Sequence, residues 1–168
     1  MYIFYLDRLP IKAAQMMCDK HVVKMIVESA QMLSTAHRYL CPHEYCEDMG
    51  LYKKAFYNHP CTIWTRTTHE NYRWLLLHWI TLCEEFYVRY GKYHKSWTDL
   101  QEGLMRFPMD IQEGELTEFA QAMNHYPDCK VPGDAVQAYR NYYHYAKDFA
   151  KWEWKRPAPD WWEGYKGA

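Results

Sequence analysis

The sequence has no basic and apolar N-terminal stretch of the kind that directs export, and no apolar run near the roughly 20 residues that cross a bilayer. Its apolar runs are short, such as residues 74–77, which His78 ends. We therefore expect a cytoplasmic protein with no membrane partner. In that reducing compartment the six cysteines are expected to be free thiols.

Common catalytic motifs are also missing. There is no Gly-rich phosphate loop, no G-x-G-x-x-G, no G-x-S-x-G and no H-E-x-x-H. These absences exclude the commonest nucleotide-binding, serine-hydrolase and metalloprotease signatures. The chain also lacks repeats, low-complexity tracts and Pro/Gly linkers, so we expect one domain over residues 1–168.

An excess of positive charge is lacking, since the net charge is −1. This value argues against a strongly basic nucleic-acid binder. The charge is uneven, however: residues 98–128 hold seven acids and one base, a charge of −6, so the remainder carries +5. A surface that binds phosphates is therefore compatible with the sequence, but only the fold can assemble it.

Aromatic residues are abundant, at 18% of the chain with 16 Tyr and 8 Trp. Tyr and Trp combine a large apolar body with a polar edge, which suits half-exposed surfaces and stacking sites as well as cores. The excess is larger than a core of this size needs, but it names no ligand.

The periodicity of apolar residues predicts an all-α fold of several packed helices, with no convincing hairpin. Thr67 and Glu70 have capping-box spacing, Gly91 is a helix stop, and Ser96 or Asp99 are candidate caps. A short apolar stretch precedes the first helix. The predicted helices are 11–40 with a break near 18–19, 51–56, 67–89, 96–105, 117–123 and 135–154.

The most informative pattern lies on the predicted helix over residues 20–40. Polar residues at steps of three and four share one face opposite an apolar stripe, namely His21, Lys24, Glu28, Gln31 and Thr35. One interpretation is a solvated face. The other is a cleft in which a cation and a histidine keep the Glu28 carboxylate ionised for stabilising or proton-transfer chemistry.

Two shorter motifs leave alternatives open. In Asn58-His59-Pro60 the proline keeps His59 out of helical geometry, which indicates either a hydrogen-bonding corner or a site histidine. Cys41, His43 and Cys46 suggest zinc, but no second pair has structural-zinc spacing, so we expect two free thiols and no metal.

The C-terminal region interleaves basic and aromatic residues, including Arg140, Arg156, Trp161 and Trp162. Basic groups suit phosphates and flat rings suit unstacked bases. An amphipathic helix with core aromatics explains the same pattern. The same ambiguity applies to Arg66, His69 and Arg73.

Taken together, these motifs resemble the pyrimidine-dimer DNA glycosylase (endonuclease V) superfamily. The resemblance follows residues 18–33, with His21 seven residues before Glu28, then Asn58-His59-Pro60, residues 138–143 and Lys155-Arg156-Pro157. It extends in order over nearly the whole chain, and is closest to uncharacterised phage and bacterial members. A phage origin would place the protein in the host cytoplasm.

The resemblance implies an all-α, endonuclease V-like fold and an amine nucleophile that needs no cofactor. The α-amine attacks C1′ of a damaged nucleoside and forms a Schiff base, and β-elimination breaks the strand. An α-amine ordinarily has a pKa of about 8, which leaves a neutral fraction at pH 7. Glu28 would be the acid/base and stabilising group, and His21 would orient it or contact phosphate.

The same resemblance assigns residues to damaged double-stranded DNA, whose base is flipped out. Because Tyr2 is bulky, Met1 is expected to be retained, so its amine, a lysine such as Lys24, or neither is the nucleophile. The expected DNA contacts are Gln31, His59, Arg66, Arg73, Arg140, Arg156, Trp161 and Trp162. The alternatives are a protein of the same fold that binds or acts on a free nucleotide or modified nucleoside, and a pure interaction protein.

Overall fold

The computed structural model describes residues 1–167, and over this range it consists of helices and irregular segments, without a β-strand. The predicted all-α fold is confirmed. The helices are α1 Pro10–Gln15, α2 Asp19–Leu40, α3 His43–Asp48, α4 Pro60–Thr67, α5 His69–Tyr90, α6 Lys95–Leu104, the 3₁₀ helix η1 Pro127–Cys129 and α7 Ala135–Ala146.

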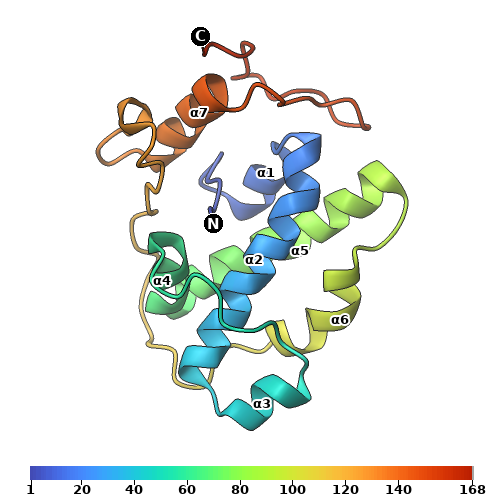
Figure 1. The fold of residues 1–168 in the computed structure, drawn as a ribbon, viewed down its shortest axis with the longest axis vertical. Helices are drawn as coiled ribbons and strands as arrows, with labels where there is room; N and C mark the ends of the chain where they lie inside the picture. Colours follow the sequence, from blue (N-terminus) through green and yellow to red (C-terminus); the bar gives the residue numbers. More distant parts are fainter. Residues whose placement is uncertain (168) are drawn as a thin grey trace.

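Helices α2 and α5 form the centre of the molecule (Figure 1). They pack on each other, α1 packs on α5, and α4 and α6 pack against both. Helix α3 lies at one end of α2, whereas α7 and the C-terminal segment cover the other end, where the chain also begins. The first residues therefore lie next to α7, where the rings of Tyr2 and Tyr142 are 5.6 Å apart.

Several helix limits follow from local signals. The predicted break is present, because α1 ends at Gln15 and α2 begins at Asp19. Pro10 and Pro60 lie in the first turns of α1 and α4. Backbone N–H groups there have no acceptor within the helix, so a proline costs no helical hydrogen bond. Gly91 ends α5 with a left-handed φ of 75°, which glycine adopts without steric strain.

The predicted caps of two helices are wrong. The cap of α5 is Thr68, whose hydroxyl accepts from the backbone N–H of Asn71, so Thr67 and Glu70 do not form the cap. The cap of α6 is His94, which accepts from the backbone N–H of Ser96. In both cases the first helical residue lies close to the predicted start.

The predicted helix over 51–56 is absent, and a helix forms at 43–48 instead. Side chains of α2 bind the backbone of 51–55 in a non-helical form. The Arg38 guanidinium donates to the carbonyls of Leu51 and Tyr52, and the Thr35 hydroxyl pairs with both backbone groups of Ala55. These contacts replace helical hydrogen bonds.

The predicted helix over 117–123 is also absent. Its backbone is bound by Asn71, which accepts from the N–H of Thr117, and by the Tyr139 hydroxyl, which accepts from the N–H of Ala122 and donates to Ala120. The last helix ends at Ala146 rather than at Trp154. Beyond it the Lys151 carbonyl accepts from the backbone N–H of Asp19, which draws the segment along α2.

The six cysteines are free, as predicted. Within residues 1–167 no helix combines the length and apolar character that crossing a membrane requires.

Candidate active site

The start of the chain lies against Glu28. The nitrogen of the Met1 α-amine is 3.4 Å from Glu28 Oε1, and the backbone N–H of Tyr2 donates to the same oxygen at 3.2 Å. The Glu28 side chain is only 14% exposed. One carboxylate oxygen thus binds both the terminal amine and the first peptide N–H, which fixes the amine at the carboxylate.

The N-terminal segment is held by its own buried side chains. Ile3 to Leu6 are buried, and successive rings face opposite sides of the segment. Phe4 stacks on His21 of α2 at 4.5 Å, whereas Tyr5 contacts Trp64 of α4 and Trp74 of α5. Burial of these rings outweighs the fraying expected of a chain end. The amine is therefore positioned by the hydrophobic core.

Lys24 and His59 complete the surroundings of Glu28. Lys24 Nζ lies 3.8 Å from Glu28 Oε2, and its side chain is 65% exposed. His59 is the cap of α4 and places its ring 5.9 Å from that of Tyr2. Burial lowers the pKa of His59, the terminal amine lowers it further, and Glu28 acts in the opposite direction. His59 therefore belongs to the site electrostatically as well as by contact.

His21 lies beneath this site rather than at its surface. It is 2% exposed, and its Nδ1 is 2.7 Å from the Tyr143 hydroxyl. Burial, with help from Lys147, Lys24 and Lys20, lowers its pKa to about 3, so the ring is neutral. A buried neutral ring does not fit the expected contact with phosphate. Its contacts are instead with the aromatic residues that support the N-terminal segment.

The polar stripe on α2 is therefore mostly covered rather than solvated. His21 and Thr35 are buried at its two ends, and Glu28 and Gln31 are partly exposed between them. Val23, an apolar residue of the same helix, is 39% exposed. The N-terminal segment covers one part of the stripe and residues 51–55 cover the other.

Lys147, just past α7, also lies at the site, although the sequence indicated it only as one of the basic residues interleaved with aromatics in the C-terminal region. Its ammonium lies over the rings of Tyr142 at 4.3 Å, Phe4 at 5.7 Å and Tyr2 at 6.0 Å. The sequence feature that could have indicated this site is the excess of aromatic residues, because several of these rings gather where α7 crosses the start of the chain.

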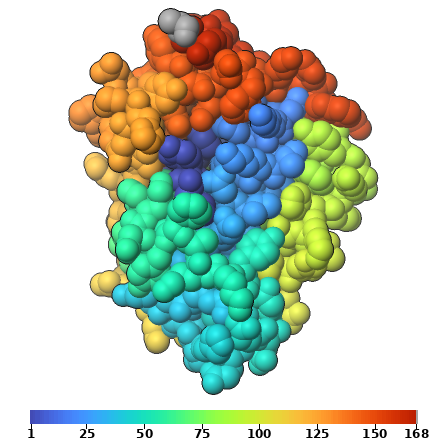
Figure 2. All heavy atoms as spheres, in the orientation of Figure 1, coloured from blue at the N-terminus to red at the C-terminus, as the bar shows by residue number. Residues whose placement is uncertain are grey.

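Figure 2 shows the first residues reaching the surface in a seam between α2, the region of α4 and the segment that leads into α7. A cavity of about 600 Å³ lies beside this seam, lined by residues that include Tyr126, Asn141 and Tyr145. Tyr126 lines the cavity and leads toward the seam. Its ring is 5.4 Å from the ring of Tyr142, and the Tyr142 ring is 5.6 Å from the ring of Tyr2. The site thus combines amines, a carboxylate and exposed rings.

The family model of pyrimidine dimer DNA glycosylases matches residues 1–99. The chain belongs to this family. No curated protein and no solved structure matches it. The matched range contains Met1, His21, Lys24, Glu28 and His59, whereas Lys147 and the C-terminal aromatic residues lie outside it.

The family membership makes DNA the substrate class. Within the matched range, however, two further predicted DNA contacts, Arg66 and Arg73, have partners other than the residues around Glu28. Arg66 donates to the Tyr57 carbonyl and lies over the Tyr57 ring, and the Arg73 side chain, 58% exposed, is 3.9 Å from Glu70. Gln31 lies one turn beyond Glu28 on α2 and is partly exposed.

Three of the C-terminal residues expected at DNA, Arg140, Arg156 and Trp161, line another cavity of about 590 Å³. Arg140 donates to the Leu6 carbonyl, lies 3.7 Å from Asp7 and stacks over Trp161 at 5.3 Å. Trp162 stacks on His144 at 5.1 Å. These side chains are occupied by contacts within the protein.

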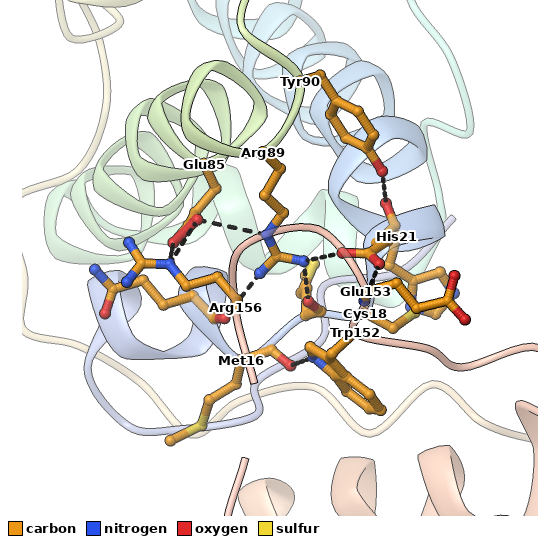
Figure 3. A network of polar contacts seen from close by, with 12 residues as sticks. Met16, Cys18, His21, Glu85, Arg89, Tyr90, Trp152, Glu153 and Arg156 are labelled. Atoms are coloured by element: carbon orange, nitrogen blue, oxygen red, sulfur yellow. Dashed lines mark hydrogen bonds and ion pairs between the residues drawn. The ribbon is translucent and has the colours of Figure 1, made fainter. Parts of the chain in front are cut away.

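Arg156 is part of a buried ionic network (Figure 3). Its Nε donates to both oxygens of Glu85, which also faces Arg89, and Arg89 donates to Asp19 at 3.0 Å. Asp19 in turn accepts from the backbone N–H of Glu153. The network attaches the C-terminal segment to α2 and α5, so Arg156 has a structural partner that the sequence did not reveal.

Cys41, His43 and Cys46 do not converge. Cys41 Sγ is 3.3 Å from His37 Nδ1, Cys46 is buried, and the exposed His43 lies beside Glu47. Among residues 1–167 no group of three His, Cys, Asp or Glu side chains is arranged to hold a metal ion.

Proposed function

We propose that this glycosylase excises a damaged or modified pyrimidine from double-stranded DNA, with the Met1 amine as nucleophile and Glu28 as acid/base. One observation carries the proposal: the 3.4 Å contact between the α-amine and the carboxylate. A nucleophile and a proton acceptor within reach of each other are the minimum for covalent catalysis. Membership of the family supplies the substrate class.

In the proposed reaction the neutral amine attacks C1′, and the C1′–N bond breaks with its electron pair leaving on the base, which takes up a proton from water. The amine gives a proton to Glu28, which passes it to the ring oxygen as the C1′–O4′ bond breaks. Nitrogen and C1′ then share a Schiff base. Loss of a C2′ proton expels the 3′ phosphate and breaks the strand.

The surroundings suit these steps. The ionised carboxylate stabilises positive charge that develops on the sugar. Lys24 is exposed next to Glu28, where it would contact a phosphate of the strand. His59, with its lowered pKa, is available as a neutral hydrogen-bonding group. Tyr126, which is 41% exposed, and the partly exposed Tyr2 offer rings on which a displaced base would stack.

The test is borohydride trapping with duplex DNA that contains either an abasic site or a cyclobutane pyrimidine dimer. We expect a covalent adduct with the native chain, mapped to Met1 by mass spectrometry. Glu28→Gln should lower its rate of formation by about 100-fold or more. Glu84→Gln, an exposed acid on α5, is the matched control and should trap like the native chain.

Absence of both an adduct and base release with the native chain would overturn the proposal. The alternative of a free nucleotide as ligand is favoured by the net charge of −1 and by the cavity beside Tyr126. Calorimetric titration with pyrimidine nucleotides distinguishes the two, because tight binding without turnover supports the alternative. We further propose a reducing, cytoplasmic location, which the six free cysteines support.

A further inference from the structure

Lys147 is surrounded by rings. Its ammonium lies over Tyr142, Phe4, Tyr2 and Phe149 at 4.3 to 6.0 Å. Such rings attract a cation, but they also exclude water from it. Because it directly follows α7, its position is fixed by the packing of that helix over the N-terminal segment.

The same side chain lies near the start of the chain. The Lys147 ammonium lies over the ring of Tyr2, whose backbone N–H donates to Glu28. Met1, with the α-amine, is the residue before Tyr2. Burial lowers the pKa of Lys147, and the positive charge of Lys24 lowers it further, while Cys18 and Glu28 act in the opposite direction. A larger neutral fraction near pH 7 is what a nucleophilic lysine needs.

Lys24, the lysine that the sequence offered as a substitute nucleophile, has a different environment. Its side chain is 65% exposed and paired with Glu28 Oε2, as expected of a cation that binds phosphate. Lys147 is instead partly buried among rings.

We propose that Lys147 is a second reactive amine of this site, which forms a Schiff base with the aldehyde of an abasic deoxyribose. The inference rests on the proposed function, since it requires an abasic site at Glu28. The neutral Nζ adds its lone pair to C1′ of the open-chain aldehyde and gives a carbinolamine. Transfer of a proton to the hydroxyl expels water and leaves the C1′=N bond. This amine captures abasic sites when the α-amine is blocked or engaged.

The experiment maps borohydride-trapped adducts by peptide mass spectrometry, with an abasic duplex as probe. In the native chain we expect adducts on both Met1 and Lys147, and the Lys147 share should rise from pH 6.5 to 8.5. With a Gly-Ser extension ahead of Met1, which removes the α-amine from Glu28, Lys147 should become the main site. Adding Lys147→Met to the extended chain should lower the remaining adduct at least tenfold.

Two variants separate a reactive amine from a cation. Lys147→Arg keeps the charge and the aromatic contacts but should not restore trapping in the extended chain. Lys20→Met removes another ammonium that lies over Phe149, at 4.5 Å, and should trap like its parent. Thermal unfolding confirms that each variant is folded.

The outcomes distinguish this inference from the proposed function. Native adducts on Met1 alone, with no adduct from a folded extended chain, would overturn the role of Lys147 and leave the proposed function standing. Full trapping by Lys147→Arg would also overturn it. An adduct on Lys147 alone supports the inference and removes Met1 from the proposed function.

Discussion

Burial shifts the pKa values of three histidines more than neighbouring charges do. His21, His37 and His78 are buried, and desolvation lowers their pKa values to about 3, about 4 and about 4. A free histidine has a pKa of about 6.5. Each ring is therefore neutral in the folded protein at every pH above about 5, and protonates more readily once the chain unfolds.

This difference predicts a loss of stability in mild acid. Because the unfolded chain binds more protons below pH 6.5, the free energy of unfolding should fall as the pH decreases from 6.5 toward 4. Each histidine contributes up to about 1.4 kcal/mol per pH unit. Urea unfolding at pH 7.0, 6.0 and 5.0 measures the slope, and His21→Gln should reduce it.

His125→Asn changes an exposed histidine and is the matched control, which should keep the native slope. A free energy of unfolding that stays constant between pH 6.5 and 5 would contradict the neutral state of the buried rings.

At the residue scale, the sequence predicted contacts between side chains that lie one helical turn apart. Glu28 and Lys24 are one turn apart on α2, and the structure brings them together as the periodicity predicts. The place of Lys147 beside the N-terminal segment was not predicted, because it depends on α7 crossing residues that are far from it in the sequence. The inward pairing of Arg156 with Glu85 is hidden for the same reason.

Among the elements, helices were predictable where their ends are encoded locally, as with Pro10, Pro60 and Gly91. The segments 51–56 and 117–123 have helical patterns but irregular structure, because distant side chains bind their backbones. Arg38 and Asn71 supply hydrogen bonds that a helix would otherwise provide. Such long-range partners leave no trace in a local pattern.

The cap of α5 gives a test at this scale. Thr68 Oγ1 accepts from the backbone N–H of Asn71 and donates to the Glu115 carbonyl, which joins the helix to the acidic segment. Thr68→Ala should lower the free energy of unfolding by about 1 kcal/mol or more. Thr67→Ala removes a hydroxyl that binds the Ile63 carbonyl within α4, and its effect should be smaller. Urea unfolding of the two variants compares them, and a larger loss for Thr67→Ala would contradict the assignment.

For the molecule as a whole, the question is how a protein of net charge −1 binds DNA. Arg140 and Arg156 face Asp7 and Glu85 within the protein. The cations near Glu28 include the Met1 amine, Lys24 and Lys147. Binding should therefore release few counterions.

This arrangement predicts a shallow salt dependence. Lys24 is the exposed cation proposed to contact phosphate, and the two other amines add at most two contacts, so the plot of log affinity against log salt concentration should have a slope no steeper than about −3. Fluorescence anisotropy with the Glu28→Gln variant and an abasic duplex measures the slope without turnover. Lys24→Ala should make the slope shallower by about 1, because one phosphate contact is lost. Arg156→Ala should leave the slope unchanged while lowering the free energy of unfolding, since it leaves the buried Glu85 with one partner fewer. A slope of −6 or steeper, or one that becomes shallower in Arg156→Ala, would instead place the C-terminal cations on DNA.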